Sequence, residues 1–478
     1  MNKIIKKYCI NRSNWKFRKI AFLAGAFIFI LIIASSCNES SVEFTNGDLV
    51  NTTVPTDNNI GDLTSEGKMI SSMLVGNNVW YKNPSQQIWD LTAQCGITSL
   101  RIGGNNYNDN MPTKAELLDW VKKAQAMGAE PIMQVSQFAT TSEVAALVKY
   151  FNIDKASGKA IKYWNIGNEP WLKLNQPATS SMGAAVETYF KPLAAAMKEV
   201  DSSIKIYGPD FSWYIEDAIN DLFGGKNNIA GKVPGKSYYY CDGISWHKYP
   251  QDNNVNTNLA YAGIDEFKAS IVKCKAKVDE ANKQLGRTGE DALGWGLGEY
   301  NAKNGSYVHS WGNGQMFAGI LNLCMQYEAK YATTWSMFEN GGSRSGTDYS
   351  FIDGNGTPRA TYRHMQMIAQ NFSGTYLEGK SSKSDIIAFG SLNDKKISVM
   401  VLNRANASSS FNLNLNYTNI NSTGGAALNI DGGSELSYKG SIEALATHIY
   451  VFDNGKITRT VYTSNDFLND KGPVTTTL

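Results

Sequence analysis

The chain has 478 residues, 42% of them hydrophobic, which is ample for one large domain and a smaller one. Its 45 lysine and arginine residues nearly balance its 43 acidic residues, and the resulting net charge of +2 argues against a nucleic-acid partner. Aromatic residues make up 11% of the chain, and tryptophan and tyrosine can serve as flat stacking surfaces, although most of them belong to the core.

Residues 1–37 have the pattern of an export signal. A basic segment precedes an apolar run over 20–33, which is too short for a comfortable transmembrane helix. The run ends in Ala34-Ser35-Ser36-Cys37, which resembles a bacterial lipoprotein signal in which Cys37 becomes the lipidated first residue. Ala34 stands where such signals more often carry leucine, and an ordinary secretory signal is the alternative. We therefore expect an exported protein, anchored through Cys37 at the outer membrane or cell surface.

Residues 38–68 are polar and lack a sustained period, which predicts a flexible tether, with a short strand near Val42-Phe44 that joins a later sheet. The remaining cysteines show neither metal-ligand spacing nor a disulfide framework. We expect them to be buried, and free or singly paired. They are Cys95, Cys241, Cys274 and Cys324.

From Met69 onward, short apolar strands alternate with helical stretches, which is typical of a parallel sheet with crossover helices. The expected strands are Ser72-Asn77, Thr98-Ile102, Glu130-Val135, Tyr163-Gly167, Ile204-Gly208, Gly243-Trp246, Trp295-Gly298 and Ala332-Ser336. The expected helices are Lys114-Ala126, Ser142-Phe151, Thr188-Val200, Ile264-Lys283 and Gln315-Tyr327. Eight strands in one such segment predict a (β/α)₈ TIM barrel over 69–372. An open doubly wound sheet is the alternative, but no Gly-x-Gly-x-x-Gly motif follows a strand.

After Tyr376 the sequence pattern changes. Alternating or β-branched runs are separated by turns of Asn, Gly and Ser, with no long helix between them. This pattern predicts a C-terminal antiparallel β-sandwich over 373–478. The expected strands are Ile386-Phe389, Ile397-Asn403, Ser410-Leu415, Ala446-Phe452 and Ile457-Tyr462. Because this part has no clustered titratable residues, we expect it to have a packing role, with glycan binding as the alternative.

Two glutamates stand at the ends of predicted barrel strands. The fourth strand, in YWNIGNEPW, ends in Asn168-Glu169-Pro170, and the seventh, in GWGLGEY, ends in Glu299. A polar turn is the plain interpretation of the first motif. However, the C-terminal strand ends of a TIM barrel form its active site, so both carboxylates are expected at one mouth. Glycoside hydrolysis needs one protonated and one ionised carboxyl in a single pocket.

Further residues at these strand ends are candidate substrate-binding groups. Arg101 would keep the nucleophile ionised, or else close the barrel mouth as a salt bridge. Asn168 would hold the sugar 2-hydroxyl, and His247 would bond the sugar or orient a carboxylate, or else be structural. Trp335 would stack on the sugar or belong to the core. The other candidates are Trp171, Asp210, Tyr249 and Tyr300.

Two other acidic stretches are weaker candidates. Glu339 lies on a Gly/Ser-rich loop that no strand end fixes, and Asp353-Gly354-Asn355-Gly356 has the pattern of a tight turn without calcium-ligand spacing. We expect neither a metal nor a cofactor.

The motifs WNIGNEP and GLGEY, with LRIGG before them and SWHKYP between, resemble the clan of retaining glycoside hydrolases with catalytic glutamates on barrel strands four and seven. The resemblance covers about 69–372 and includes families of β-xylosidases, heparanase-like β-glucuronidases, α-L-arabinofuranosidases and xyloglucanase-type endoglucanases. It implies that Glu169 is the acid/base and Glu299 the nucleophile. No single family matches the whole chain, so the substrate stays open.

The expected activity is therefore double displacement, with carboxyl groups about 5 to 5.5 Å apart, against about 6.5 to 9.5 Å for inversion. Aromatic residues on the predicted mouth loops favour an endo-acting enzyme on a β-linked polysaccharide. They include Trp80, Tyr81, Phe211, Trp213, Tyr214 and Trp311. An exo-acting glycosidase of the same clan is one alternative, and a glycan-binding lipoprotein without catalysis is another.

Overall fold

A computed structural model describes residues 59–80, 84–154, 160–250, 257–303, 306–339, 348–394, 396–416, 435–453 and 456–478. The predicted export signal with Cys37, the predicted strand Val42-Phe44, and Tyr81 lie outside these residues. Within the described ranges, no helix combines the length and the apolar character that crossing a membrane requires. The four cysteines from Cys95 onward are buried and free, as expected.

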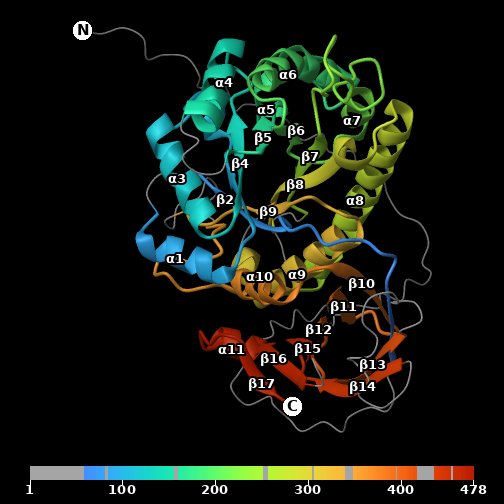
Figure 1. Cartoon of the computed structure of the whole chain (residues 1–478). Coiled ribbons are helices and arrows are strands. Elements are labelled where there is room, and N and C mark those ends of the chain that lie inside the picture. The colour runs from blue at the N-terminus through green and yellow to red at the C-terminus, as the bar shows by residue number, and fades with distance from the viewer. Residues whose placement is uncertain are drawn as a thin grey trace, which may run out of the picture. The chain divides into compact units, whose positions relative to one another are not determined.

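Eight parallel strands close into a barrel in chain order, with the last strand paired to the first (Figure 1). Their side chains are buried along nearly their whole length, as expected for parallel strands covered by helices. Each predicted barrel strand overlaps an observed one, so the barrel prediction is confirmed. The strands are β2 (Val75–Val79), β3 (Ser99–Ile102), β4 (Glu130–Val135), β5 (Tyr163–Ile166), β6 (Lys205–Phe211), β7 (Gly243–Lys248), β8 (Gly294–Tyr300) and β9 (Ala332–Thr334).

Amphipathic helices surround the barrel. In α3, Leu117, Trp120, Val121 and Ala124 are buried at three- and four-residue spacing, and Thr113 begins the helix with a capping box. The helices are α1 (Gln86–Cys95), α2 (Asn106–Asp109), α3 (Lys114–Ala126), α4 (Thr141–Val148), the π-helical turn Lys149–Asp154, α5 (Trp171–Leu174), α6 (Ser180–Val200), α7 (Glu216–Leu222), α8 (Thr257–Leu285), α9 (Trp311–Gln326) and α10 (Ala360–Asn371).

A cluster of large side chains fills the barrel near the N-terminal ends of its strands. Met73, Ile132, Tyr163, Tyr207 and Tyr331 contact one another there, and Tyr207 packs on both Tyr163 and Tyr331. These five side chains are at most 6% exposed. The N-terminal end is therefore packed, and ligand access is left to the C-terminal mouth, as in other TIM barrels.

The C-terminal strands form one nine-stranded sheet in the order β14-β13-β1-β10-β11-β12-β15-β16-β17. The sheet bends over its own core, because Phe411 of β13 and Tyr438 of β14 contact Tyr450 of β15, which is not their hydrogen-bonded neighbour. The sandwich prediction is thus confirmed. The strands are β10 (Thr375–Ser381), β11 (Ile386–Asn393), β12 (Lys396–Asn403), β13 (Ser409–Asn416), β14 (Glu435–Ile442), β15 (Ala446–Asp453), β16 (Lys456–Thr463) and β17 (Val474–Thr477); the short helix α11 (Ser464–Leu468) precedes β17.

Strand β1 (Asn59–Thr64) comes from the segment predicted to be a tether. It lies between β13, to which it is parallel, and β10, to which it is antiparallel. The tether prediction over 38–68 is therefore wrong at its C-terminal end. β1 joins the later sheet, whereas Val42-Phe44, where such a strand was predicted, lies outside the described residues.

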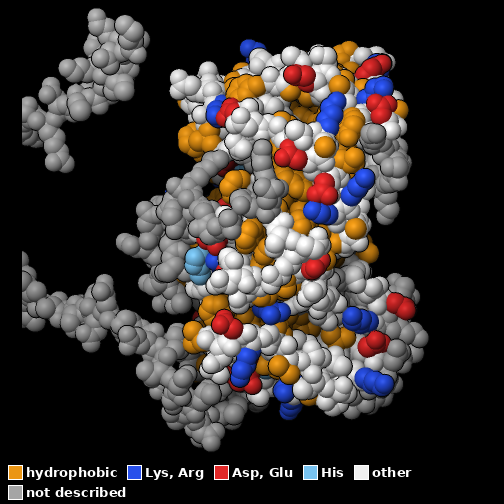
Figure 2. Space-filling view, turned by 90° about the vertical axis from the view of Figure 1, so that its left-hand side faces the viewer, with side chains coloured by type: hydrophobic (Ala, Val, Ile, Leu, Met, Phe, Trp, Pro, Cys, Tyr) orange, Lys and Arg blue, Asp and Glu red, His pale blue; other side chains and the backbone are white. Residues whose placement is uncertain are grey.

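On the face shown in Figure 2, acidic and basic side chains of the described residues lie close together. This distribution accords with the near balance of charges in the sequence.

Candidate active site

The backbone turns sharply where β5 and β6 end. Gly167 has a φ of 80°, and Glu169 and Asp210 have φ values of 44° and 53°, in the left-handed region that residues with a Cβ seldom adopt. The Glu169 N–H donates to the Asp210 carbonyl at 2.9 Å, which ties the two turns together. Such backbone strain in non-glycine residues is concentrated at functional sites.

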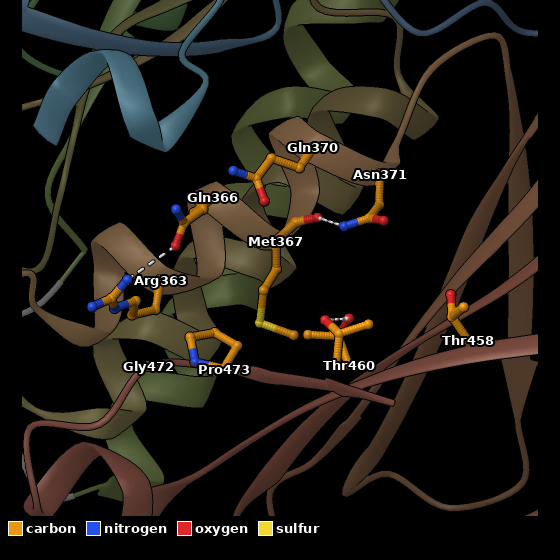
Figure 3. Close-up of a pocket in the computed structure, with 10 residues that line it drawn as sticks. Arg363, Gln366, Met367, Gln370, Asn371, Thr458, Thr460, Gly472 and Pro473 are labelled. Atoms are coloured by element: carbon orange, nitrogen blue, oxygen red, sulfur yellow. Dashed lines mark hydrogen bonds between the residues drawn. The ribbon is translucent and has the colours of Figure 1, made fainter. Parts of the chain in front are cut away.

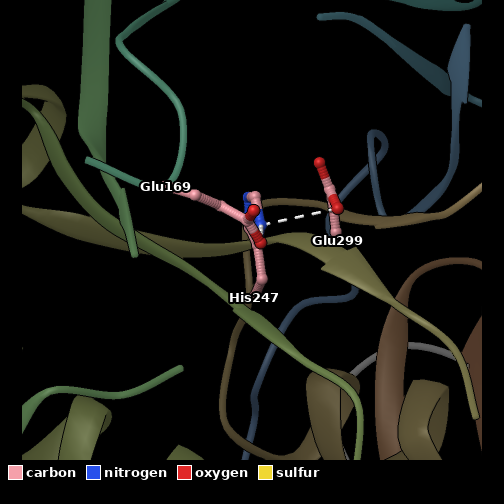
Figure 4. A group of neighbouring side chains, drawn as sticks. All are labelled: Glu169, His247 and Glu299. Carbon is pink, nitrogen blue, oxygen red and sulfur yellow. Dashed lines mark hydrogen bonds and ion pairs between the residues drawn. The ribbon is translucent and has the colours of Figure 1, made fainter. Parts of the chain in front are cut away.

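Glu169, His247 and Glu299 meet at the C-terminal ends of β5, β7 and β8 (Figure 4). His247 pairs with Glu299 in the register of β7 and β8. Its Nδ1 lies 3.2 Å from Glu169 Oε1 and 3.5 Å from Glu299 Oε2. One oxygen of each glutamate and a histidine nitrogen all lie within 4.8 Å of one another. The sequence prediction that the two glutamates face each other thus agrees with the geometry.

Glu299 is held from both sides. Arg101 Nη1 donates to its Oε1 at 3.1 Å, and the Tyr249 hydroxyl donates to its Oε2 at 2.8 Å. Close packing also restricts Gly298, since a Cβ there would lie 2.7 Å from Asp210 Oδ1. The Glu299 side chain is 7% exposed, and its orientation is therefore fixed before any ligand arrives.

Arg101 is fully buried and connects four strand ends. Besides Glu299, it donates to Asp210 Oδ2 at 3.0 Å, Asn168 Oδ1 at 2.5 Å and Asn78 Oδ1 at 2.8 Å. Its guanidinium is thus a fixed positive charge between two carboxylates. The salt bridges join the strand ends at the mouth, and the same charge opposes the rise that burial causes in the pKa of Glu299. The expected role of keeping a nucleophile ionised stays a prediction.

Glu169 is the more accessible glutamate, with 15% of its side chain exposed. Asn105 Nδ2 donates to its Oε2 at 2.6 Å, and Asn168 Nδ2 donates to Asn105 Oδ1 at 2.8 Å. Asn108 Nδ2 in turn donates to the Asn168 carbonyl at 2.8 Å. The Asn168 side chain is therefore engaged with Arg101 and Asn105, and its expected contact with a sugar hydroxyl stays a prediction.

Burial raises the pKa of Glu299, and the charge of Glu169 adds to the rise against the opposing effects of His247, Arg101 and Tyr249. Burial also acts to raise the pKa of Glu169, but hydrogen bonds from His247 and Asn105 lower it overall. The pKa of His247 is raised in spite of burial, because Glu299, Glu169 and Asp210 favour its charged form. These shifts favour the protonated forms of Glu299 and His247 and the ionised form of Glu169, and the three groups titrate as a coupled cluster.

Sequence reasoning did not single out Asn78, Asn105 or Gln134 as part of this site. Gln134 Oε1 accepts from the Gly104 N–H at 2.7 Å, behind Arg101. Asn78 directly follows the predicted strand Ser72-Asn77, and Asn105 directly follows the Gly-Gly of LRIGGNN. An asparagine at the end of a predicted barrel strand was the available sequence signal for Asn78, and an asparagine just after a strand was the signal for Asn105.

Two aromatic residues expected on the mouth loops are buried instead, since Phe211 is 0% exposed and Trp311 packs against His364 and Tyr462. Four other aromatic candidates form two pairs. Trp335 stacks on Trp80, with centroids 5.9 Å apart and planes inclined by 16°. Trp171 and Trp213 meet edge to face, with centroids 5.3 Å apart, and are 37% and 38% exposed.

Tyr300 is not at the mouth, so its prediction as a substrate contact is wrong. Its ring is fully buried against Phe317 of α9 and Phe267 of α8. Successive residues of a strand face opposite sides, and because Glu299 faces into the barrel, Tyr300 faces the helices.

The same three side chains, Glu169, His247 and Glu299, have the donor types of a metal site. However, the Arg101 guanidinium already contacts one Glu299 oxygen and would repel a cation there. The arrangement thus fits proton transfer and attack by a carboxylate better than metal binding.

A separate cavity of about 480 Å³ lies between α10 and strands β16 and β17 (Figure 3). It has no carboxylate in its lining and shares no residue with the glutamate cluster, so it cannot supply the same chemistry. Its lining consists of Arg363, Gln366, Met367, Gln370, Asn371, Thr458, Thr460, Gly472, Pro473 and Thr475.

The sequence matches no protein-family model and no curated protein. Its structure is similar to that of a family 51 α-L-arabinofuranosidase from Bifidobacterium longum, with a TM-score of 0.57 and 14% identity over 76% of this chain and 88% of the other. A family 44 xyloglucanase from Paenibacillus polymyxa gives 0.58 and 11%, over 81% and 97%. A bifunctional glucanase–xylanase from a metagenome library gives 0.58 and 14%, over 81% and 97%. The chain shares the fold of these proteins, a (β/α)₈ barrel followed by a β-sandwich.

Proposed function

We propose that the protein is a retaining glycoside hydrolase in which Glu169 is the acid/base and Glu299 the nucleophile. The observation that carries this proposal is the pair of carboxylates, with oxygens within 4.8 Å of each other, at the open end of the barrel. Such a separation suits the retaining mechanism, at about 5 to 5.5 Å, and leaves little room for the water that inversion needs. Enzymes named for glycosidic substrates share the fold, which supports the same substrate class.

In the first step, Glu299 attacks the anomeric carbon while Glu169 gives its proton to the glycosidic oxygen. The carbon–oxygen bond to the leaving sugar breaks, and an ester joins the remaining sugar to Glu299. In the second step, Glu169 removes a proton from water, which attacks the anomeric carbon and releases Glu299. Two inversions give net retention.

His247 supports this sequence because it contacts both carboxylates. With its raised pKa it holds a proton 3.2 Å from Glu169 Oε1, on the side of the more exposed glutamate. In the free protein the pKa of Glu169 is lowered and that of Glu299 is raised, which is the reverse of the protonation that these roles need. The proposal therefore requires that a bound sugar shifts the proton from His247 or Glu299 to Glu169. Arg101 and the Tyr249 hydroxyl meanwhile stabilise the charge that returns to Glu299 in the second step.

The test is a digest of a polysaccharide panel of β-glucans, xylans, mannans, galactans and algal polymers, with ¹H NMR of the first anomer released. We expect the retained anomer. On the polymer that is cut, Glu299→Ala and Glu169→Ala should lower kcat by about a thousandfold or more, equal to about 4 kcal/mol. Glu187→Gln, which removes a charge paired with Lys191 on α6, is the control and should leave kcat unchanged. Unchanged turnover of Glu299→Ala would contradict the assignment. Glycan binding without turnover by the wild type would support the binding-only alternative.

We further propose endo action on a β-linked glycan, because exposed aromatic surface lies on the side of the acid. Trp171 follows Glu169 by two residues, and Trp213 follows Asp210 by three residues. The ring of Trp213 packs against the ring of Trp171. The acid protonates the leaving sugar, so these two rings are placed to stack on that part of a chain. An exo-acting enzyme that releases only the terminal sugar has less need of such a surface.

Product sizes separate the two modes. An oligosaccharide ladder supports endo action, and monosaccharide alone from the outset supports the exo alternative. Trp213→Ala should lower kcat/KM for the polymer and leave kcat/KM for the corresponding glycosyl fluoride unchanged, since the fluoride carries no leaving sugar. Equal losses on both substrates would contradict the assigned role of the Trp171–Trp213 pair.

For localisation, we propose export and lipid anchoring at Cys37, on the strength of the sequence pattern alone. Cys37→Ser should move the protein from the membrane fraction to the soluble fraction. Retention of this variant in the membrane fraction would contradict anchoring at that residue.

A further inference from the structure

Glu339 is a buried carboxylate outside the catalytic pair. It is 5% exposed, and both of its oxygens accept hydrogen bonds from neutral N–H groups. The Trp335 indole Nε1–H donates to Oε1 at 3.0 Å, and the Tyr349 backbone N–H donates to Oε2 at 2.7 Å. The Glu339 N–H itself donates to Ser350 Oγ at 2.8 Å, which fixes its backbone. This carboxylate therefore joins the segment after β9 to the segment at Tyr349 and Ser350.

The first branch from Glu339 leads to the Trp335 ring. This ring is half-buried and stacks on Trp80. Gly104 is also close to this ring, since an added Cβ there would lie 2.7 Å from Trp335 Cη2. Trp335 thus sits beside the segment that carries Asn105, the donor to Glu169. The hydrogen bond to Glu339 determines how the indole is turned between these neighbours.

The second branch leads to the proposed nucleophile. The ring of Tyr349 meets the ring of Tyr249 edge to face, with centroids 6.0 Å apart. The Tyr249 hydroxyl donates to Glu299 Oε2 at 2.8 Å. A displacement of Tyr349 would therefore change the packing behind the hydroxyl that supports Glu299.

We propose that Glu339 is a positioning residue. Its carboxylate holds the indole ring of Trp335, here called the platform, and holds Tyr349, whose ring packs against Tyr249 behind Glu299. The proposal rests on the glycoside hydrolase function, because it assigns Trp335 to sugar stacking. Both hydrogen bonds need an acceptor, which the ionised carboxylate offers at each oxygen. Protonation places an O–H on one oxygen, where it competes with the N–H group already pointing there. The platform is then expected to loosen, and substrate binding to weaken.

The burial of Glu339 and the charges around it determine the pH at which its carboxylate is protonated. Burial raises the pKa of Glu339 to about 7, against the lowering effect of the Tyr349 and Trp335 hydrogen bonds; Asp348 raises it further and Arg359 lowers it. Arg359 is itself paired with Asp348 at 2.7 Å, so its charge is largely compensated. A further titratable group, His309, has its Nε2 2.7 Å from the Asp348 carbonyl. The loosening should therefore occur near neutral pH.

The experiment compares the wild type with Glu339→Gln on the polymer that the wild type cuts. Glutamine offers one acceptor oxygen and one N–H₂ group, so it can satisfy only one of the two N–H donors. We expect the wild-type KM to rise severalfold as the pH falls from 8 to 6. In Glu339→Gln, KM should be raised at both pH values and should not vary between them. The effect on kcat should be smaller than the effect on KM. Glu378→Gln is the matched control. The Glu378 carboxylate also accepts a side-chain hydrogen bond, from the Gln326 amide, but it lies on β10 of the C-terminal sheet and not at the barrel mouth.

A second measurement does not depend on turnover. Intrinsic fluorescence is titrated from pH 5 to 9 in the wild type, Glu339→Gln and Trp335→Phe. The transition near pH 7 should be present in the wild type and absent from both variants. If the wild type cuts no polymer but shows this transition, the proposed function fails while the hydrogen-bonded link between Glu339 and Trp335 stands. A folded Glu339→Gln that keeps the wild-type KM profile, or the fluorescence transition, would overturn the inference.

Discussion

Replacing Arg101 by methionine tests whether the buried charge network holds the barrel mouth together. Arg101 lies 3.0 Å from Asp210 and 3.1 Å from Glu299, whose side chains are 0% and 7% exposed. Its removal leaves both carboxylates without their fixed partner. Removing one partner of a buried ion pair typically costs about 3 to 5 kcal/mol. At roughly 2 °C per kcal/mol for a barrel of this size, the Tm should fall by about 6 to 10 °C.

Differential scanning calorimetry measures this Tm, and a second substitution separates lost packing from uncompensated charge. Adding Asp210→Asn to Arg101→Met removes one orphaned charge and should recover part of the loss, a coupling of about 1 to 3 kcal/mol. Lys173→Met is the control, because Lys173 pairs with Asp109 at 36% and 46% exposure and should cost at most about 1 kcal/mol. A Tm of Arg101→Met within 2 °C of the wild type, or no recovery in the double variant, would refute the reasoning.

Three further predictions concern single side chains. Tyr249→Phe removes the 2.8 Å hydrogen bond to Glu299 and should lower kcat/KM by about 10- to 150-fold, equal to about 1.5 to 3 kcal/mol for a bond to a charged group; an unchanged kcat/KM would count against this contact. His247→Asn should cost more stability at pH 5.5 than at pH 9 in urea unfolding. The raised pKa of His247 gives stability that is fully present below its unfolded value near 6.5 and is lost as the pH rises through the folded value. Glu339, with a pKa raised from 4.5 to about 7, makes the wild type less stable as the pH rises between these values, by about 3 kcal/mol in all. Glu339→Gln should lack this loss, and parallel pH profiles of the two proteins would contradict it.

The sequence was sufficient to predict the barrel because each strand is a short apolar run that ends at polar residues. Glu169 and Glu299 could be found for the same reason, since strand ends in a TIM barrel converge. Tyr300 was wrongly predicted to contact substrate, although successive side chains of a strand point to opposite faces, so that Tyr300 and Glu299 cannot both face into the barrel. Applying that rule at every strand end would have moved Tyr300 to the helix-packed face.

The remaining parts depend on contacts that no local pattern carries. Asn105 is one of several polar residues in its segment, and only the folded chain brings its amide to Glu169. Glu339 was set aside because its loop is rich in Gly and Ser, yet the hydrogen bonds of Trp335 and Tyr349 fix it. Strand β1, NIGDLT, lacks a clear alternation, because its place is determined by partners more than 300 residues away.

The position of β1 also has a consequence for the order of folding. Its two neighbours, β10 and β13, are synthesised after the whole barrel, so β1 cannot complete its pairing until nearly the entire chain has left the ribosome. The barrel is an insertion between two adjacent strands of one sheet, and it can close while that sheet is still incomplete. Pairing across so long a loop is slow to form. During synthesis, β1 therefore has unpaired backbone groups, and we expect the last step of folding to pair it with β10 and β13.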